Sequence, residues 1–161
     1  MSRPVSIIMG SQSDLETVKE CSDLLKAFGI GFESKVLSAH RSPKELTKYV
    51  EGAPQRGVKI FIAAAGGAAA LAGVIASHSV LPVIAIPMET RSLKGLDSLL
   101  STVQMPAGIP VACMSIGKTG SKNAALLALA ILGITDKKIR IKIASYRLDM
   151  CRKIKQIKVK L

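Results

Sequence analysis

The stretch SAHRSP, residues 38–43, places a histidine and an arginine side by side between two serines. Arg41 can hold a phosphate through paired, charge-assisted hydrogen bonds, and Ser38 and Ser42 can add further donors. His40 can accept and release a proton near neutral pH. The same residue types also form an ordinary helix start with a histidine at the surface, so this stretch alone leaves both interpretations open.

The stretch GSQSD, residues 10–14, offers a second set of groups suited to an anion. Gly10 allows a tight backbone turn, and Ser11 and Ser13 supply hydroxyls. A helix that begins here would present free backbone N–H groups to a phosphate, and Asp14 could accept hydrogen bonds from a ribose. A serine near an acidic residue is also a common helix cap, so the ligand interpretation again has a simpler alternative.

The stretch AAAGGAAALAG, residues 63–73, contains no ionisable side chain but allows close approach to its backbone. Gly66 and Gly67 admit a ligand near the main chain, and the flanking alanines make a flat floor for a small planar ring. Close packing between a helix and a sheet would explain the same composition. The chain lacks the glycine patterns of dinucleotide-binding and P-loop proteins, and no cluster of carboxylates or histidines predicts a metal site.

The remaining reactive side chains give weaker signals. His78 lies in or at the end of a predicted helix, where a single histidine is usually structural or solvated. Cys21, Cys113 and Cys151 are odd in number, lie far apart and lack the spacing of metal ligands. We therefore expect three reduced thiols and no catalytic role for His78.

Short apolar runs alternate along the chain with segments of helical periodicity. Strands are predicted at 4–10, 32–37, 58–65, 82–87 and 110–116, and helices at 11–29, 42–57, 66–80, 93–104, 121–133 and 136–161. Ser13 with Glu16 matches a capping box, and Ser42 matches an N-cap before Pro43. Strands that are apolar on both faces belong to parallel sheets covered by helices. This alternation predicts one domain over 1–161, a three-layer α/β sandwich of flavodoxin-like type with helices on both faces of the sheet.

Composition narrows the class of protein. The formal net charge is +12, but ten of the 23 basic residues lie in 137–160, and the remaining 13 nearly balance the 11 acidic residues. Aromatic residues make up 3% of the chain, so the basic segment lacks the stacking platforms typical of single-strand binding. We interpret it as a solvated helix face and do not expect nucleic acid as the main partner.

No apolar run reaches the ~20 residues needed to span a bilayer, and the first residues lack a signal-peptide pattern. The expected location is cytoplasmic. The segments AAALAGVIAS and NAALLALAIL offer little polar surface to water. A helix that is apolar all round is usually buried, so the two segments predict a sizeable homo-oligomer.

The motifs MGSQSD, SAHRSP, AAAGGAAALAG, GLDSLLSTVQMPAGIPVA and SKNAALLALAILG occur in this order from about Val5 to about Gly133. Together they resemble class I N5-carboxyaminoimidazole ribonucleotide mutase of de novo purine (IMP) synthesis. The resemblance implies a flavodoxin-like homo-octamer. It also implies an isomerase that moves a carboxylate from the exocyclic N5 to ring carbon C4 of one substrate, without ATP, metal or biotin.

Site residues carry over from the family motif by motif. His40 would be the general acid and base, and Arg41 would hold the ribose phosphate. The substrate-binding set implied by the resemblance is Ser11, Ser13, Asp14, Ser38, Ala39, Arg41, Gly66, Gly67, Ala68, Ala70 and Leu71. Within this set the resemblance gives the third stretch, from Gly66 to Leu71, the role of backbone contacts.

The third stretch departs from the family pattern, which reads Gly-Gly-Ala-Ala-His-Leu-Pro-Gly. Ala70 stands where the family has histidine, and Ala72 where it has proline. We expect binding to be retained and turnover to be reduced. Two alternatives stay open: the related class II carboxylase, which adds free CO2 to aminoimidazole ribonucleotide, and a non-enzymatic protein that binds nucleotide or, through its basic tail, nucleic acid.

Overall fold

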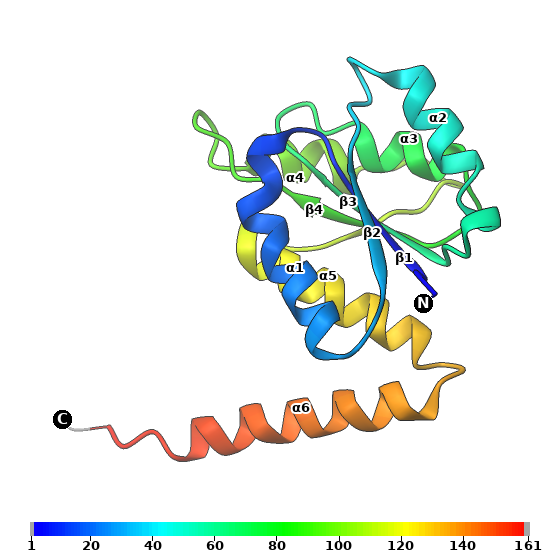
Figure 1. The fold of residues 1–161 in the computed structure, drawn as a ribbon. Helices are drawn as coiled ribbons and strands as arrows, with labels where there is room; N and C mark the ends of the chain where they lie inside the picture. Colours follow the sequence, from blue (N-terminus) through cyan, green and yellow to red (C-terminus); the bar gives the residue numbers. More distant parts are fainter. Residues whose placement is uncertain (1, 160–161) are drawn as a thin grey trace.

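The computed structural model describes residues 2–159 as a five-stranded parallel sheet between layers of helices (Figure 1). The strands are β1 (Val5–Met9), β2 (Phe32–Val36), β3 (Ile60–Ala65), β4 (Val83–Pro87) and β5 (Ala112–Cys113). The helices are α1 (Leu15–Ala27), α2 (Pro43–Glu51), α3 (Leu71–Ser77), α4 (Leu96–Val103), α5 (Gly117–Leu132) and α6 (Lys137–Lys155). Two short 3-10 helices are η1 (Gln12–Asp14) and η2 (Pro54–Arg56).

The order of the strands across the sheet is β2-β1-β3-β4-β5, and every pair is parallel. This is the order of the flavodoxin-like fold, in which the ligand lies where the strand order reverses, between β1 and β3. The structure thus confirms the predicted fold class. The chain reverses its direction of travel across the sheet after β2, so the loops that follow β1 and β3 diverge and leave a crevice between them.

Alternate residues of each strand face opposite layers of the sandwich. In β1, Ile7 packs into the cluster formed with α1 and α5, whereas its neighbour Ile8 packs into the cluster formed with α2 and α3. Both side chains are fully buried, as expected when helices cover both faces of a parallel sheet. The paired clusters make the sheet a rigid frame for the loops at its ends.

Several predicted boundaries are wrong at the ends of elements. Helix α1 is preceded by η1, and the capping box is formed by Ser11 and Asp14, not by Ser13 and Glu16. Ser42 occupies the N-cap position of α2, but its hydroxyl binds the backbone of Ser38 and makes no cap hydrogen bond. In both places a serine near the helix start is used by the loop before the helix, which periodicity does not reveal.

The later elements also differ in length from the prediction. Strand β5 has two residues, because this edge strand pairs with β4 only at Ala112 and Cys113. Helix α3 begins at Leu71, since the glycine-rich residues before it form a loop. Helix α5 begins earlier than expected, at Gly117, and α6 ends at Lys155; the last two residues of the predicted terminal helix lie outside the described residues.

Helices α3 and α5, which were predicted to contact other subunits, bury much of their apolar surface within one chain. Helix α5 is enclosed by α1, β4 and α6, and its Ala124, Ala125, Ala128 and Leu129 are fully buried within one chain. Exposed apolar side chains are found on other elements. They include Leu93, Leu96, Leu100 and Val103 on and before α4, and Ile141, Leu148, Met150 and Ile154 on α6.

Helix α6 lies under the body of the molecule and extends beyond it (Figure 1). Its first half packs on α5, and Lys142 donates a hydrogen bond to the carbonyl of Phe28 at 2.8 Å. Its basic residues are exposed, in agreement with a solvated helix face. No helix among residues 2–159 combines the length and apolar character that crossing a membrane requires.

A half-buried ion pair joins β2 to α2 and η2. The carboxylate of Glu33 accepts hydrogen bonds from the guanidinium of Arg56 at 2.9 Å and from the hydroxyl of Tyr49 at 2.6 Å. The guanidinium also stacks on the Tyr49 ring, 4.1 Å from its centroid. Burial alone would raise the pKa of Glu33, but the hydrogen bonds from Arg56 and Tyr49 outweigh it, so the pKa lies below its ordinary value.

We expect Glu33→Gln to lower the free energy of unfolding at pH 7 by about 1–3 kcal/mol, because it removes a charge-assisted hydrogen bond. A lowered pKa in the folded state stabilises the protein above the ordinary glutamate value of 4.5 and loses this effect as the pH falls through the folded value. Urea unfolding should therefore show that the difference in unfolding free energy between wild type and Glu33→Gln becomes smaller as the pH falls below 4.5.

The control for this measurement is Glu45→Gln on the exposed side of α2. An exposed charge is worth less than about 1 kcal/mol, so this variant should unfold close to wild type. A Glu33→Gln protein as stable as the Glu45→Gln protein at pH 7 would show that the ion pair contributes nothing to stability.

Candidate functional site

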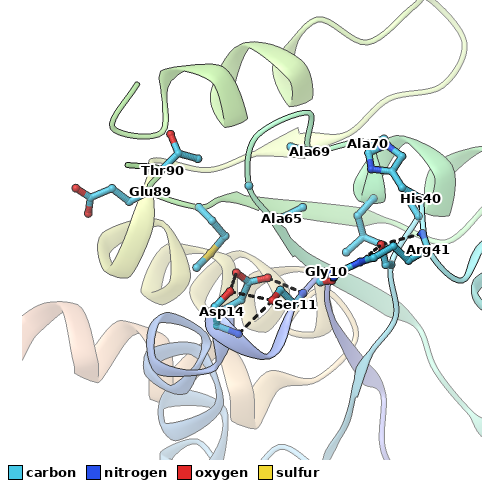
Figure 2. Close-up of a pocket in the computed structure, with 16 residues that line it drawn as sticks. Gly10, Ser11, Asp14, His40, Arg41, Ala65, Ala69, Ala70, Glu89 and Thr90 are labelled. Carbon is cyan, nitrogen blue, oxygen red and sulfur yellow. Dashed lines mark hydrogen bonds between the residues drawn. The ribbon is translucent and has the colours of Figure 1, made fainter. Parts of the chain in front are cut away.

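A pocket of about 470 Å³ lies at the carboxyl end of the sheet, between the loops that follow β1, β2, β3 and β4 (Figure 2). Ten of the sequence-predicted site residues line it: Ser11, Ser13, Asp14, Ser38, Ala39, His40, Arg41, Gly66, Ala70 and Leu71. Gly67 and Ala68 are not among the lining residues. The three stretches that the sequence singles out thus face one cavity, at the crevice that the strand order predicts.

The loop after β1 is held by the residues that start the first helix. Asp14 accepts a hydrogen bond from the backbone N–H of Ser11 at 3.0 Å, and the Ser13 hydroxyl donates to that of Ser11 at 2.9 Å. Asp14 is only 7% exposed. Burial raises its pKa, although the hydrogen bonds from Ser11, Ser13 and Gly10 lower it in part. The result is a fixed carboxylate with two serine hydroxyls at the pocket wall.

Arg41 joins the loop after β2 to the loop after β1. Its Nη2 donates to the carbonyl of Gly10 at 3.2 Å, and its Nε lies 3.5 Å from the Ser38 hydroxyl. The Ser38 hydroxyl also accepts from the backbone N–H of Arg41 at 3.2 Å. These contacts fix the guanidinium while Nη1 makes no hydrogen bond within residues 2–159, so one edge remains able to bind an anion.

His40 precedes Arg41 and lies at the end of the pocket away from Asp14 (Figure 2). Its side chain is exposed, and the ring makes no hydrogen bond to any residue that the structure describes. Ala70 lines the same pocket and is labelled in the same part of the view. Both ring nitrogens of His40 are therefore without a hydrogen-bonding partner within residues 2–159.

The loop after β3 differs from the expectation at Gly67. Its φ of +66° is one that glycine adopts readily, but its backbone groups are already occupied. The Gly67 N–H donates to the Ser98 hydroxyl at 3.0 Å, and its carbonyl accepts from the Ser101 hydroxyl at 3.2 Å. Gly67 and Ala68 were predicted to bind substrate, but the wall of this pocket is formed by Gly66, Ala69, Ala70 and Leu71.

Met88, Glu89 and Thr90 after β4 form a fourth wall, and none of them was among the predicted site residues. Met88 is 7% exposed and forms an apolar part of the wall. The Glu89 carboxylate points away from the other labelled side chains (Figure 2). Their position in the chain could have predicted this wall, because these residues follow the predicted strand 82–87. The carboxyl ends of neighbouring parallel strands lie at one edge of the sheet, where ligands bind.

The other reactive residues lie outside this pocket. His78, at the end of α3, has its ring nitrogens 3.6 Å from Glu51 and 3.5 Å from Thr47. All three cysteines are free, and burial raises the pKa of Cys21 to about 12. Within residues 2–159 no three histidine, cysteine or carboxylate side chains are grouped to hold a metal ion.

Comparison with known proteins identifies the same family that the sequence motifs resemble. The AIR carboxylase family model matches residues 4–153. The N5-carboxyaminoimidazole ribonucleotide mutase of Pyrococcus horikoshii is 52% identical over 94% of this chain and 85% of that protein. The enzyme of the same name from Bacillus subtilis is 50% identical over 89% of this chain and 88% of that protein.

Among solved structures, PurE of Treponema denticola has a TM-score of 0.84 at 33% identity, covering 93% of this chain and 92% of that one. The family model spans almost the whole chain, and the curated relatives share about half of its residues over nearly their full length. The pocket, its loops and these matches lead to one conclusion: the chain belongs to the AIR carboxylase family.

Proposed function

We propose that this protein is an N5-carboxyaminoimidazole ribonucleotide mutase that produces 4-carboxy-5-aminoimidazole ribonucleotide. The observation that carries the proposal is the convergence of His40, Arg41 and the Ser11–Asp14 turn on one pocket. The relatives of the same name, about 50% identical, support the reaction class. The alternatives share the fold, so the reaction has to be tested directly.

The proposed binding mode places the charged end of the substrate at the shared edge of the loops after β1 and β2. Arg41 and the hydroxyls of Ser11, Ser13 and Ser38 bind the ribose phosphate, because they combine a fixed cation with short-range donors. Asp14 accepts hydrogen bonds from the ribose hydroxyls. The imidazole ring lies over the wall formed by Gly66, Ala70 and Leu71, with its reacting edge near His40.

The proposed chemistry needs one proton donor that later acts as a base. The C–N bond of the carbamate breaks to release CO2, its electron pair stays on N5, and protonated His40 delivers a proton to that nitrogen. Ring carbon C4 then attacks the trapped CO2 to form the new C–C bond. Neutral His40 removes the proton from C4, which restores the aromatic ring and returns the imidazole to its first state.

The apolar and small side chains of the pocket support the CO2 step. Ala65, Ala69, Ala70 and Met88 line the cavity without offering a charged group to a neutral gas. Holding two reactants next to each other can supply a large share of a rate enhancement. General acid–base help adds about 10²–10⁴-fold, so confinement of CO2 and proton transfer by His40 are both required.

The deciding experiment is direct turnover of the N5-carboxylated substrate, followed by the appearance of the C4-carboxylated product. A second reaction supplies aminoimidazole ribonucleotide with bicarbonate. Product from the second reaction and none from the first would establish the class II carboxylase instead. Absence of product from both would favour a protein that binds nucleotide without turning it over.

We expect Ala70→His to raise kcat in the same assay by about tenfold, since an added imidazole near His40 contributes to proton transfer or polarises the carboxylate. Ala69→Ser, a polar change at the neighbouring buried position, is the control. An Ala70→His enzyme slower than wild type would show that the pocket is adapted to alanine.

The proposal includes a homo-octamer in the cytoplasm, as the resemblance implies. Exposed apolar side chains before and along α4, among them Leu93, Leu96 and Leu100, support subunit contacts. Light scattering after size-exclusion chromatography measures the mass directly. A mass equal to that of one chain at the concentration used in the activity assay would overturn the proposed octamer.

A further inference from the structure

Helix α4 does not line the pocket, but its side chains make hydrogen bonds to the loops after β3 and β4, which do. Ser98 is fully buried in its first turn, and none of the pocket-lining residues belongs to this helix. The Ser98 hydroxyl donates to the carbonyl of Met88 at 2.7 Å and accepts from the N–H of Gly67 at 3.0 Å. One hydroxyl therefore joins the loop after β3 to the loop after β4, at the base of two pocket walls.

Ser101, one turn later on α4, completes the attachment. Its hydroxyl lies 3.2 Å from the Gly67 carbonyl and 2.7 Å from the carbonyl of Asp97. Gly67 is thus bound at both its N–H and its C=O by side chains of one helix. Its positive φ, +66°, turns the chain so that Gly66 and Ala70 face the cavity.

A second contact ties the start of α4 to the loop after β4. The Thr90 hydroxyl donates to the Asp97 carboxylate at 2.8 Å and accepts from the Gly95 N–H at 3.1 Å. Gly66 sits close to this loop as well: a Cβ there would lie 3.4 Å from the Met88 side chain and 3.6 Å from that of Thr90. The two walls are consequently placed relative to each other by α4.

We infer that Ser98, assisted by Ser101, is a positioning residue: it fixes the position of the loop Gly66–Leu71 relative to the substrate ring that lies over it. The inference rests on the proposed function for its chemistry. A buried hydroxyl that satisfies one donor and one acceptor leaves both unpaired when it is removed. The wall then shifts, while the phosphate contacts around Arg41, on the other side of the pocket, stay in place.

The test compares Ser98→Ala with Thr102→Val. Thr102 is a buried hydroxyl one turn along the same helix, and it donates only to the helix carbonyl of Ser98 at 2.7 Å. Small displacements of a bound substrate can cost about 10²-fold, so Ser98→Ala should lower kcat by about 10- to 100-fold with KM within about threefold. Thr102→Val should lower stability without changing kcat.

Hydrogen exchange gives a readout that needs no turnover. Segment 66–71 of the Ser98→Ala protein should exchange at least about tenfold faster than in wild type and Thr102→Val, because the Gly67 N–H loses its acceptor. A wild-type chain without product refutes the proposed function, whereas unchanged exchange in this segment overturns the role of Ser98.

Ser101→Ala keeps the inference testable if Ser98→Ala does not fold, since the Ser101 side chain is exposed. This variant removes one of the two bonds to Gly67 and should lower kcat by about three- to tenfold. Equal kcat values for wild type, Ser101→Ala and Thr102→Val would contradict a positioning role for the helix.

Discussion

Replacing His40 with asparagine is expected to lower kcat by about 10²–10⁴-fold, the usual contribution of a general acid–base group. Asparagine keeps a polar side chain of similar size but cannot take up or release a proton at neutral pH. The ring of His40 makes no hydrogen bond within the described chain, so its removal should leave the loop intact. Substrate affinity, measured by calorimetry, should stay within about threefold of wild type.

The matched control is His78→Asn, which changes the only other histidine of the chain. His78 lies at the end of α3, beside Glu51 and Thr47, and does not line the pocket. This variant should retain the kcat of wild type. Full activity in His40→Asn would remove His40 from the mechanism and leave proton transfer to another group of the pocket.

Replacing Arg41 with alanine is expected to raise KM by about 10- to 100-fold, since a charge-assisted hydrogen bond contributes about 1.5–3 kcal/mol. The phosphate is distant from N5 and C4, so kcat should change by less than about fivefold. Steady-state kinetics over a wide range of substrate concentration separates the two constants. Arg41→Lys should fall between wild type and alanine, because lysine keeps the charge and loses the paired geometry.

Arg147→Ala provides the control for the loss of one positive charge from a basic protein. Arg147 is exposed on α6 and lies outside the pocket. If this variant raises KM as much as Arg41→Ala does, the effect comes from the overall field of the molecule. A loss confined to kcat in Arg41→Ala would instead assign Arg41 to the chemical step.

Much of the fold was predictable because apolar strands and turn residues alternate so regularly. The run 58–65 is apolar except for Lys59, and strands that are apolar on both faces belong to sheets covered by helices on both sides. Once the sheet was known to be parallel, the edge that carries the site followed from topology. The positions of His40 and Arg41 were therefore predictable from two neighbouring strands, without knowledge of any side-chain contact.

The contacts that complete the site were not predictable from local sequence. The wall at Met88 and Thr90 follows β4 and contains no residue type that by itself signals a ligand. Gly67 was predicted to bind a ligand because a glycine lets a ligand approach the main chain closely. Only the approach of Ser98 and Ser101, about thirty residues later in the sequence, shows that α4 uses its backbone groups.

The start of α1 illustrates a smaller error with the same origin. Ser13 and Glu16 have capping-box spacing, but Ser11 and Asp14 have it too, and the structure uses the earlier pair. The choice is made by tertiary contacts, because Gly10 is fixed by a backbone hydrogen bond to Ala64 and by Arg41. Propensity cannot decide between two caps that differ by two residues.

The four loops of the pocket emerge from β1, β2, β3 and β4, so occupancy of the pocket depends on the integrity of these four strands. A molecule that contacts all four loops binds only when these four strands are in register, so a form in which one of them is unfolded loses affinity. Saturation at a hundred times the dissociation constant then adds about 2.7 kcal/mol to the free energy of global unfolding. The ligand thereby acts as a reversible cross-link between β1, β2, β3 and β4. With the ligand bound, these four strands should unfold together in a more cooperative transition.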